Sequence, residues 1–96
     1  MSSTMYVGQI RASYAALVAA FGPSQVWDEF KSDAEWQVDL GDLGAAFVYN
    51  YANGRNYLGP KAPPVEEITE WHIGGITSAV IPPILDRLEP HLRNAA

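Results

Sequence analysis

The chain has 96 residues and a mass of 10.5 kDa, which is the size of one domain, so we expect a single domain over residues 1–96 without an interdomain cleft. Hydrophobic residues make up 48% of the chain and charged residues 18%, which excludes a disordered polar segment and predicts a folded domain. The net charge is −5, and this acidic balance disfavours nucleic acid as a partner.

Residues needed for several chemistries are missing from the sequence. There is no cysteine, which excludes disulfides, a thiolate nucleophile and a zinc site built on sulfur. His72 and His91 have no metal-ligand spacing around them, so we expect no metal and no cofactor. No serine has the Gly-x-Ser-x-Gly setting of a hydrolase, and we expect a protein that is not an enzyme. Without a signal-peptide pattern or an apolar run of about 18 residues, we expect no membrane and a cytoplasmic location.

Apolar residues at helical spacing predict a first helix that ends at Phe21. Its stripe consists of Ile10, Tyr14, Leu17, Val18 and Phe21. Gly22 and Pro23 mark the end, because glycine adopts the left-handed conformation of a helix C-cap and proline cannot continue the hydrogen bonding. The candidate N-caps are Ser3, Thr4 and Gly8.

Alternation with a period of two predicts two strands joined by a hairpin. The clearer strand runs from Ala34 to Leu40, with Trp36 on its apolar side. Gly41-Asp42-Leu43-Gly44 supplies a short turn, and Ala45 to Tyr51 resumes a β-rich run. We expect the two strands to pair antiparallel.

The second half of the chain predicts a long connection, a strand and a helix. The connection from Ala52 to about Pro64 exceeds a usual hairpin loop, so it is either a binding element or a loose segment. Ile68 to Ile73 predicts a third strand, closed by a Gly74-Gly75 turn. A second helical stripe runs from Ile81 to Leu92; its first turn accommodates Pro82 and Pro83, and Pro90 should kink or divide it.

These elements predict an α+β fold of order αβββα, a three-stranded antiparallel meander with two helices on one face. The expected core consists of Leu17, Val18, Phe21, Trp36, Val38, Phe47 and Ile84. The other face of so thin a sheet is left uncovered. Tyr49 and Tyr51 share one parity and cannot join Val48 in the core, so we expect a second copy to cover this face in a homodimer.

Four segments resemble a family of small proteins encoded by bacteriophages and prophages. They are Phe21-Gly22-Pro23, Asp28-Glu29-Phe30-Lys31, Val48-Tyr49-Asn50-Tyr51 and Trp71-His72-Ile73-Gly74-Gly75. Ala52-Asn53-Gly54 departs from the acidic residue and Trp or Lys that often follow in the family. The resemblance covers Tyr14 to Gly75 and implies expression in the cytoplasm of a host bacterium. It implies no enzymatic activity.

A candidate binding site follows from the strand, the turn and the helix that come after the long connection. Two glycines and two hydroxyls before a helix can present backbone N–H groups to a phosphate, and Arg55 adds a positive charge. The candidate ligand or partner-binding residues are Trp71, His72, Gly74, Gly75, Ser78, Arg55 and Tyr57. The structural alternative is that Trp71 packs inward, His72 makes one hydrogen bond and the glycines only redirect the chain.

Exposed aromatics and an acidic surface favour a protein partner. Trp27 and Tyr57 have no assigned core position and are typical of interface anchors. The region of the first strand is acidic, which is either a solvated face or a surface that meets a basic site. We therefore expect a non-enzymatic phage accessory protein that binds and modulates a host macromolecule. The alternatives are a nucleotide-sequestering protein and a minor virion or assembly component.

Overall fold

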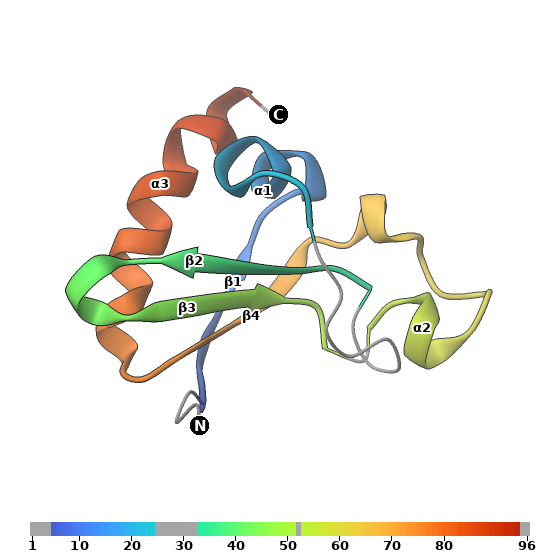
Figure 1. Ribbon diagram of the computed structural model, residues 1–96. Coiled ribbons are helices and arrows are strands. Elements are labelled where there is room, and N and C mark those ends of the chain that lie inside the picture. The colour runs from blue at the N-terminus through green and yellow to red at the C-terminus, as the bar shows by residue number, and fades with distance from the viewer. Residues whose placement is uncertain (1–4, 25–32, 52, 95–96) are drawn as a thin grey trace.

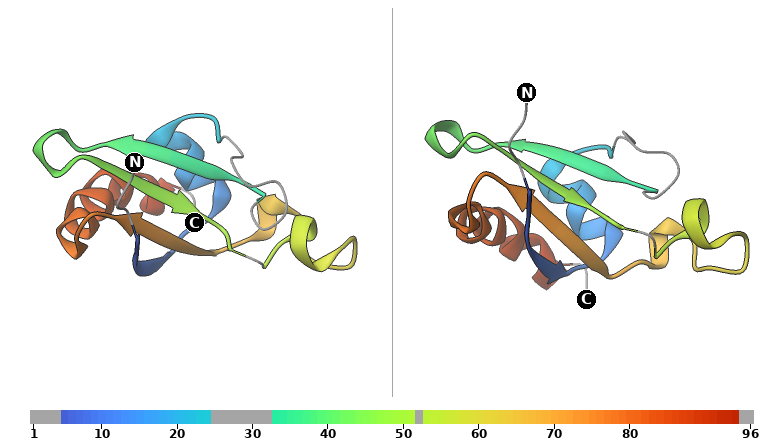
Figure 2. Two further views of the ribbon diagram at one scale, coloured as in Figure 1. Left: turned by 60° about the horizontal axis from the view of Figure 1, so that its bottom comes forward. Right: turned by 90° about the horizontal axis from the view of Figure 1, so that it is seen from below.

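The computed structural model describes residues 5–24, 33–51 and 53–94 and has four antiparallel strands with two helices packed on one face (Figures 1 and 2). The strands are β1 Met5–Arg11, β2 Glu35–Asp39, β3 Ala45–Tyr49 and β4 Glu70–Gly75. The helices are α1 Tyr14–Phe21, the one-turn α2 Arg55–Leu58 and α3 Ile81–Asn94. Short 3₁₀ turns cover Gly41–Leu43, Val65–Glu67 and Ser78–Val80. The candidate caps Ser3 and Thr4, and Trp27 with Asp28 to Lys31, lie outside the described residues.

The α+β class is confirmed, and a fourth strand is the main difference from the predicted order. The sheet order is β1-β4-β3-β2, so the predicted meander forms β2, β3 and β4, and β1 adds to its edge beside β4. An irregularity in the β1 register between Tyr6 and Gly8 interrupts the strand's alternation. Ile10, which was expected in the first helix, pairs with Trp71 as part of β1. The predicted start of the first helix was therefore wrong. The Ser13 hydroxyl caps α1 instead, accepting a hydrogen bond from the Ala16 N–H at 3.1 Å.

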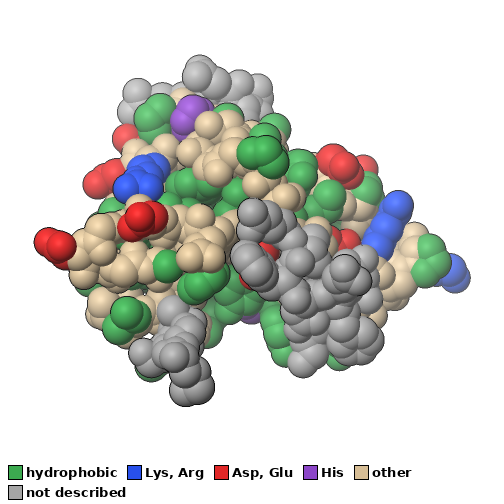
Figure 3. Space-filling model, in the orientation of Figure 1, with side chains coloured by type: hydrophobic (Ala, Val, Ile, Leu, Met, Phe, Trp, Pro, Cys, Tyr) green, Lys and Arg blue, Asp and Glu red, His purple; other side chains and the backbone are tan. Residues whose placement is uncertain are grey.

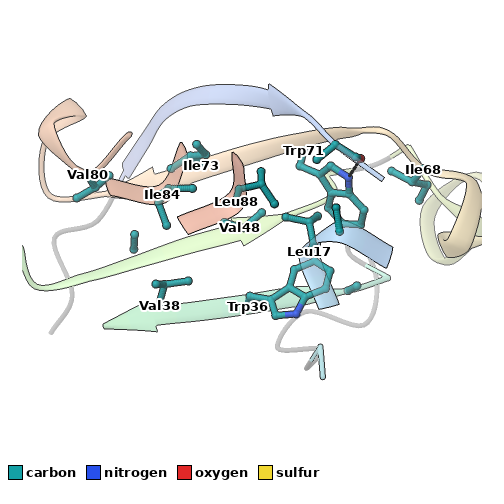
Figure 4. Packing of buried hydrophobic residues seen from close by; sticks show 14 residues of the cluster. Leu17, Trp36, Val38, Val48, Ile68, Trp71, Ile73, Val80, Ile84 and Leu88 are labelled. Atoms are coloured by element: carbon teal, nitrogen blue, oxygen red, sulfur yellow. Dashed lines mark hydrogen bonds between the residues drawn. The ribbon is translucent and has the colours of Figure 1, made fainter. Parts of the chain in front are cut away.

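The core lies between the sheet and the two long helices (Figure 4). It includes the predicted residues Leu17, Trp36, Val38 and Ile84, with Val18 and Phe21 partly buried against it. The prediction for Phe47 was wrong. In the β2–β3 register Trp36 pairs with Val48, which places Val48 inward, whereas Phe47 pairs with the exposed Gln37 on the opposite face.

Two buried indoles hold both ends of α1 against the sheet. Trp71 on β4 donates its Nε1 hydrogen to the Ala12 carbonyl at 2.9 Å, just before the helix. Trp36 on β2 donates to the Gly22 carbonyl at 2.7 Å, just after the helix. The two rings meet edge to face with centroids 5.3 Å apart, and the Tyr14 ring contacts both. Each polar indole atom is thus satisfied inside the core.

Asn50, which is fully buried, organises the open end of the β2–β3 hairpin. Its Oδ1 accepts hydrogen bonds from the Asp33 and Ala34 N–H groups at 2.7 and 3.0 Å. Its Nδ2 donates to Asp33 Oδ1 and to Asn53 Oδ1, both at 3.1 Å. Gly54 packs so closely that an added Cβ would collide with Asp33 Oδ1. The amide therefore links the start of β2 to the start of the long connection.

The second half of the chain differs from its prediction at three places. The long connection contains α2, which projects beyond the end of the sheet (Figure 1). Gly74 and Gly75 are not a turn, because both are paired residues of β4. Pro90 lies within α3, which continues as one helix. The carbonyl of Asp86, which loses its N–H donor to this proline, belongs to an exposed residue that water can reach.

Replacement of Trp36 and of Phe47 by alanine tests the assignment of the two sheet faces. We expect Trp36→Ala to lower the free energy of unfolding by about 3–5 kcal/mol, because it opens a cavity and removes the bond to Gly22. Phe47→Ala should cost about 1 kcal/mol, because this half-buried ring lies outside the core. Urea denaturation of both variants measures the difference, and equal losses would contradict the assignment.

Asn50→Asp tests the buried amide. The substitution replaces the donating Nδ2 by an oxygen beside the Asp33 carboxylate, and we expect a loss of about 3 kcal/mol at pH 7. Asn53→Asp is the matched control, since it keeps the acceptor for Asn50 and gives up only an exposed bond to the Glu70 carbonyl. Equal midpoints of thermal unfolding for the two variants would show that the buried Asn50 amide contributes no more to stability than the exposed bond of Asn53.

Candidate binding site on the open sheet face

The face of the sheet opposite α1 and α3 carries ordered rows of side chains. One row crosses all four strands as Gln9, His72, Tyr49 and Glu35. The next row consists of Tyr6, Gly74, Phe47 and Gln37. Alternation along β2, β3 and β4 sets these rows, because the neighbouring residues Trp36, Val48 and Trp71 face the core. Figure 2 shows the helices behind the sheet, so within the described ranges no helix covers this face.

Aromatic side chains surround a hollow on this open face. The hollow has a volume of about 290 Å³ and is lined by Tyr6, Tyr49, Tyr51 and His72. The imidazole contacts all three phenol rings, with centroid distances of 4.9 Å to Tyr6, 5.6 Å to Tyr49 and 5.9 Å to Tyr51. We call these four residues the aromatic cluster.

Local geometry explains how the aromatic cluster forms. Tyr6 reaches it because β1 pairs with β4, and Tyr51 because it directly follows the buried Asn50. Gly74 leaves space beside Tyr49, since a Cβ there would already lie 3.6 Å from Tyr49 Cε1. A larger side chain at position 74 would therefore fill part of the hollow.

The environment of the aromatic cluster favours a neutral imidazole. Burial lowers the pKa of His72 below its ordinary value of 6.5, which shifts the ring toward its neutral form at pH 7. Burial also raises the pKa of Tyr49 above 10.0, and the negative charge of Glu35 raises it further. Glu35 pairs with Tyr49 across the β2–β3 register and so places a carboxylate beside the hollow.

One ion pair lies on the same face of the sheet, in the row beside Gln9 and His72. Arg11 contacts the Glu70 carboxylate at 3.4 Å, with both side chains largely exposed, so the pair adds little to stability. Figure 3 shows another side of the molecule, on which acidic side chains occur at several separate places.

The structure does not bring the predicted site residues together. Trp71 is fully buried, whereas His72 and Gly74 lie on the open face. Arg55 and Tyr57 lie on α2, near the start of β4, where the Asn53 side chain donates to the Glu70 carbonyl. Ser78 follows the other end of β4, and the strand's six residues separate the two ends by about 20 Å. The inward packing of Trp71 matches the structural alternative.

The predicted phosphate site lacks its turn. Gly74 and Gly75 are strand residues, and Gly75 faces Val80, whose Cγ2 would lie 2.7 Å from an added Cβ. Arg55 is engaged elsewhere, because its Nε donates to the Ala62 carbonyl at 3.0 Å and its backbone N–H to Asp33 Oδ2. Of the predicted residues, His72 lines the hollow, and Gly74 lies next to the lining residue Tyr49.

Sequence reasoning missed Tyr6 and the grouping of Tyr49 and Tyr51 with His72. The shared parity of the two tyrosines signalled that they leave the core together. The alternation that would have marked Tyr6 is interrupted by the irregularity in β1. A pairing between the first strand and the last could not be inferred from local periodicity.

The chemistry of the lining suits binding. Three phenols and a neutral imidazole offer ring faces, hydroxyl groups and ring edges to a bound group.

Over the described residues, no three His, Asp or Glu side chains gather so that they could hold a metal ion. None of the helices in the described ranges combines the length and apolar character needed to cross a bilayer.

Compared with known protein families, with curated protein sequences and with solved structures, the chain matches none of them.

The titration of His72 tests how far the aromatic cluster shields it. We expect an NMR pKa below 6.5 and a shift back toward 6.5 in Tyr6→Ser, because removal of the nearest ring hydrates the imidazole. Because the folded pKa is lowered, the unfolded chain takes up the proton first, and the His72 contribution to stability is lost as the pH falls through about 6.5. A wild-type pKa above 6.5 would contradict the burial of this ring.

Proposed function

We propose that the chain is a non-enzymatic phage or prophage accessory protein that binds and modulates a host macromolecule through its open sheet face. The aromatic cluster carries this proposal. Tyr6 and Tyr51 are 55% and 45% exposed on a face that no described helix covers. Tyrosine is enriched where proteins bind one another, because it offers a large rigid ring with a polar end. The phage setting follows from the resemblance of the sequence, and the host cytoplasm follows from that setting.

A protein is the partner that these observations favour. The net charge of −5 disfavours nucleic acid, since a binding surface for phosphates needs an excess of positive charge. The nucleotide alternative depended on the Gly74-Gly75 turn, and these residues lie within β4. The hollow, at about 290 Å³, is also at the lower end of the range for pockets that enclose a whole small molecule.

The expected homodimer would use the same face. Two copies would bring together two chains that each carry a net charge of −5. Like charge opposes association and favours a partner with a complementary, basic surface. Self-association stays a prediction that sedimentation of the wild-type protein measures directly.

Capture of the host partner tests the proposed function. Tagged wild-type protein and the double variant Tyr6→Ser/Tyr51→Ser are incubated with host bacterial lysate, and bound proteins are quantified by mass spectrometry. We expect the variant to recover the main partner at least about tenfold less well, because two central aromatic contacts are lost. Circular dichroism confirms that both proteins are folded.

The matched control is Leu85→Ser/Leu92→Ser on α3. These residues are 41% and 37% exposed, so the control removes exposed apolar surface away from the aromatic cluster. It should recover the partner as well as the wild type does. Equal capture by all three proteins would contradict the use of the open face, and capture of virion proteins alone would favour the assembly alternative.

A further inference from the structure

We propose that the hollow in the aromatic cluster binds one cationic side chain, an arginine or a lysine, of the partner protein. This inference rests on the proposed function, because it assigns the chemistry of the group that the partner inserts. Ring geometry, the nearby carboxylate and the size of the hollow each support it.

The rings offer their faces and edges from different directions. Relative to the imidazole plane, the Tyr6 and Tyr49 rings are inclined by 64° and 77°, whereas the Tyr51 ring is nearly parallel at 18°. All three phenol centroids lie within 5.9 Å of the imidazole centroid. A cation is attracted by an aromatic face within about 6 Å of its centroid, so a single charge in the hollow can interact with several rings at once.

Charge at the rim selects a cation over an anion. Glu35 lies beside Tyr49 in the β2–β3 register, close enough for its negative charge to raise the pKa of that phenol. The described residues that line the hollow include no lysine or arginine. Arg11, the basic residue of β1, contacts Glu70 in the adjacent row. Phosphate and carboxylate groups would thus meet negative ring faces and a nearby carboxylate, with no positive charge among the described lining residues.

The size and openness of the hollow fit one side chain carried by a larger partner. Its volume of about 290 Å³ holds a side chain more readily than a complete ligand. The exposed Tyr6 and Tyr51 rings lie at its margin, where the rest of a partner surface would rest. A basic partner also complements the net charge of −5.

The first experiment uses defined probes. The wild-type protein is titrated with N-acetyl-arginine methylamide, with the neutral citrulline analogue and with inorganic phosphate, and the ring signals of Tyr6, Tyr51 and His72 are followed by NMR. We expect the arginine probe to shift these signals with an affinity about tenfold above that of citrulline. Equal affinities, or tighter binding of phosphate, would overturn the inference.

Variants separate attraction by the ring from other effects. Tyr51→Phe keeps the aromatic face and should retain most of the affinity, whereas Tyr51→Leu should reduce it severalfold. Glu35→Gln should also weaken the arginine probe and leave citrulline unaffected. Tyr57→Leu is the matched control, because Tyr57 is 46% exposed and Tyr51 45%, but Tyr57 lies outside the hollow. Equal losses in Tyr51→Phe and Tyr51→Leu would overturn the role of the ring.

The outcome for this site can be distinguished from that for the proposed function. If the host partner is captured through the open face but the arginine probe does not bind, the cationic group is refuted and the proposed function stands. If the probe binds and no partner depends on the open face, the proposed function fails while the chemistry of the hollow holds. A dimer that Tyr51→Leu dissociates would identify a second copy as the occupant and overturn the inference.

Discussion

The edge-to-face contact between Trp36 and Trp71 fixes which way each of their strands faces. Both indoles point inward because each donates a hydrogen bond to a carbonyl at one end of α1. Since successive side chains of a strand alternate, an inward Trp71 requires an outward His72. The core thereby determines the position of the imidazole at the centre of the aromatic cluster. Two residues buried in the core, Trp36 and Trp71, thus determine where the candidate site lies.

The Asn50 network provides the second constraint, at the edge of the site. Asn50 is buried and bonded on both sides of its amide, so the chain leaves β3 in one defined direction. Tyr51 follows immediately, and its ring stacks on His72 at an interplanar angle of 18°. A polar group with its hydrogen bonds satisfied in the interior specifies one arrangement more narrowly than an apolar contact of the same size. The position of the Tyr51 ring on His72 therefore depends on Asn50, a side chain that faces away from the hollow.

Local patterns predicted the elements whose periodicity is regular. The β2–β3 hairpin, the inward Trp36 and α3 with its early prolines all follow from spacing alone. Phe47 could not be placed this way, because β3 puts small Ala46 inward and a large ring outward, against the usual hydrophobic pattern. The pairing of Val48 with Trp36 is what shows which side of β3 faces the core. The aromatic cluster was beyond local reasoning, since it combines residues of β1 and β4 from opposite ends of the chain.

The pairing of β1 with β4 determines when the hollow can form during synthesis of the chain. Tyr6 leaves the ribosome well before its neighbour Gly74 and the imidazole of His72, because both follow it much later in the chain. Contacts between such distant parts of a chain also form late in folding, because they close a long loop and this costs conformational entropy. A nascent or truncated chain that ends before β4 thus has no hollow to offer. The hollow therefore forms only when β4 has paired with β1 and β3 in the sheet.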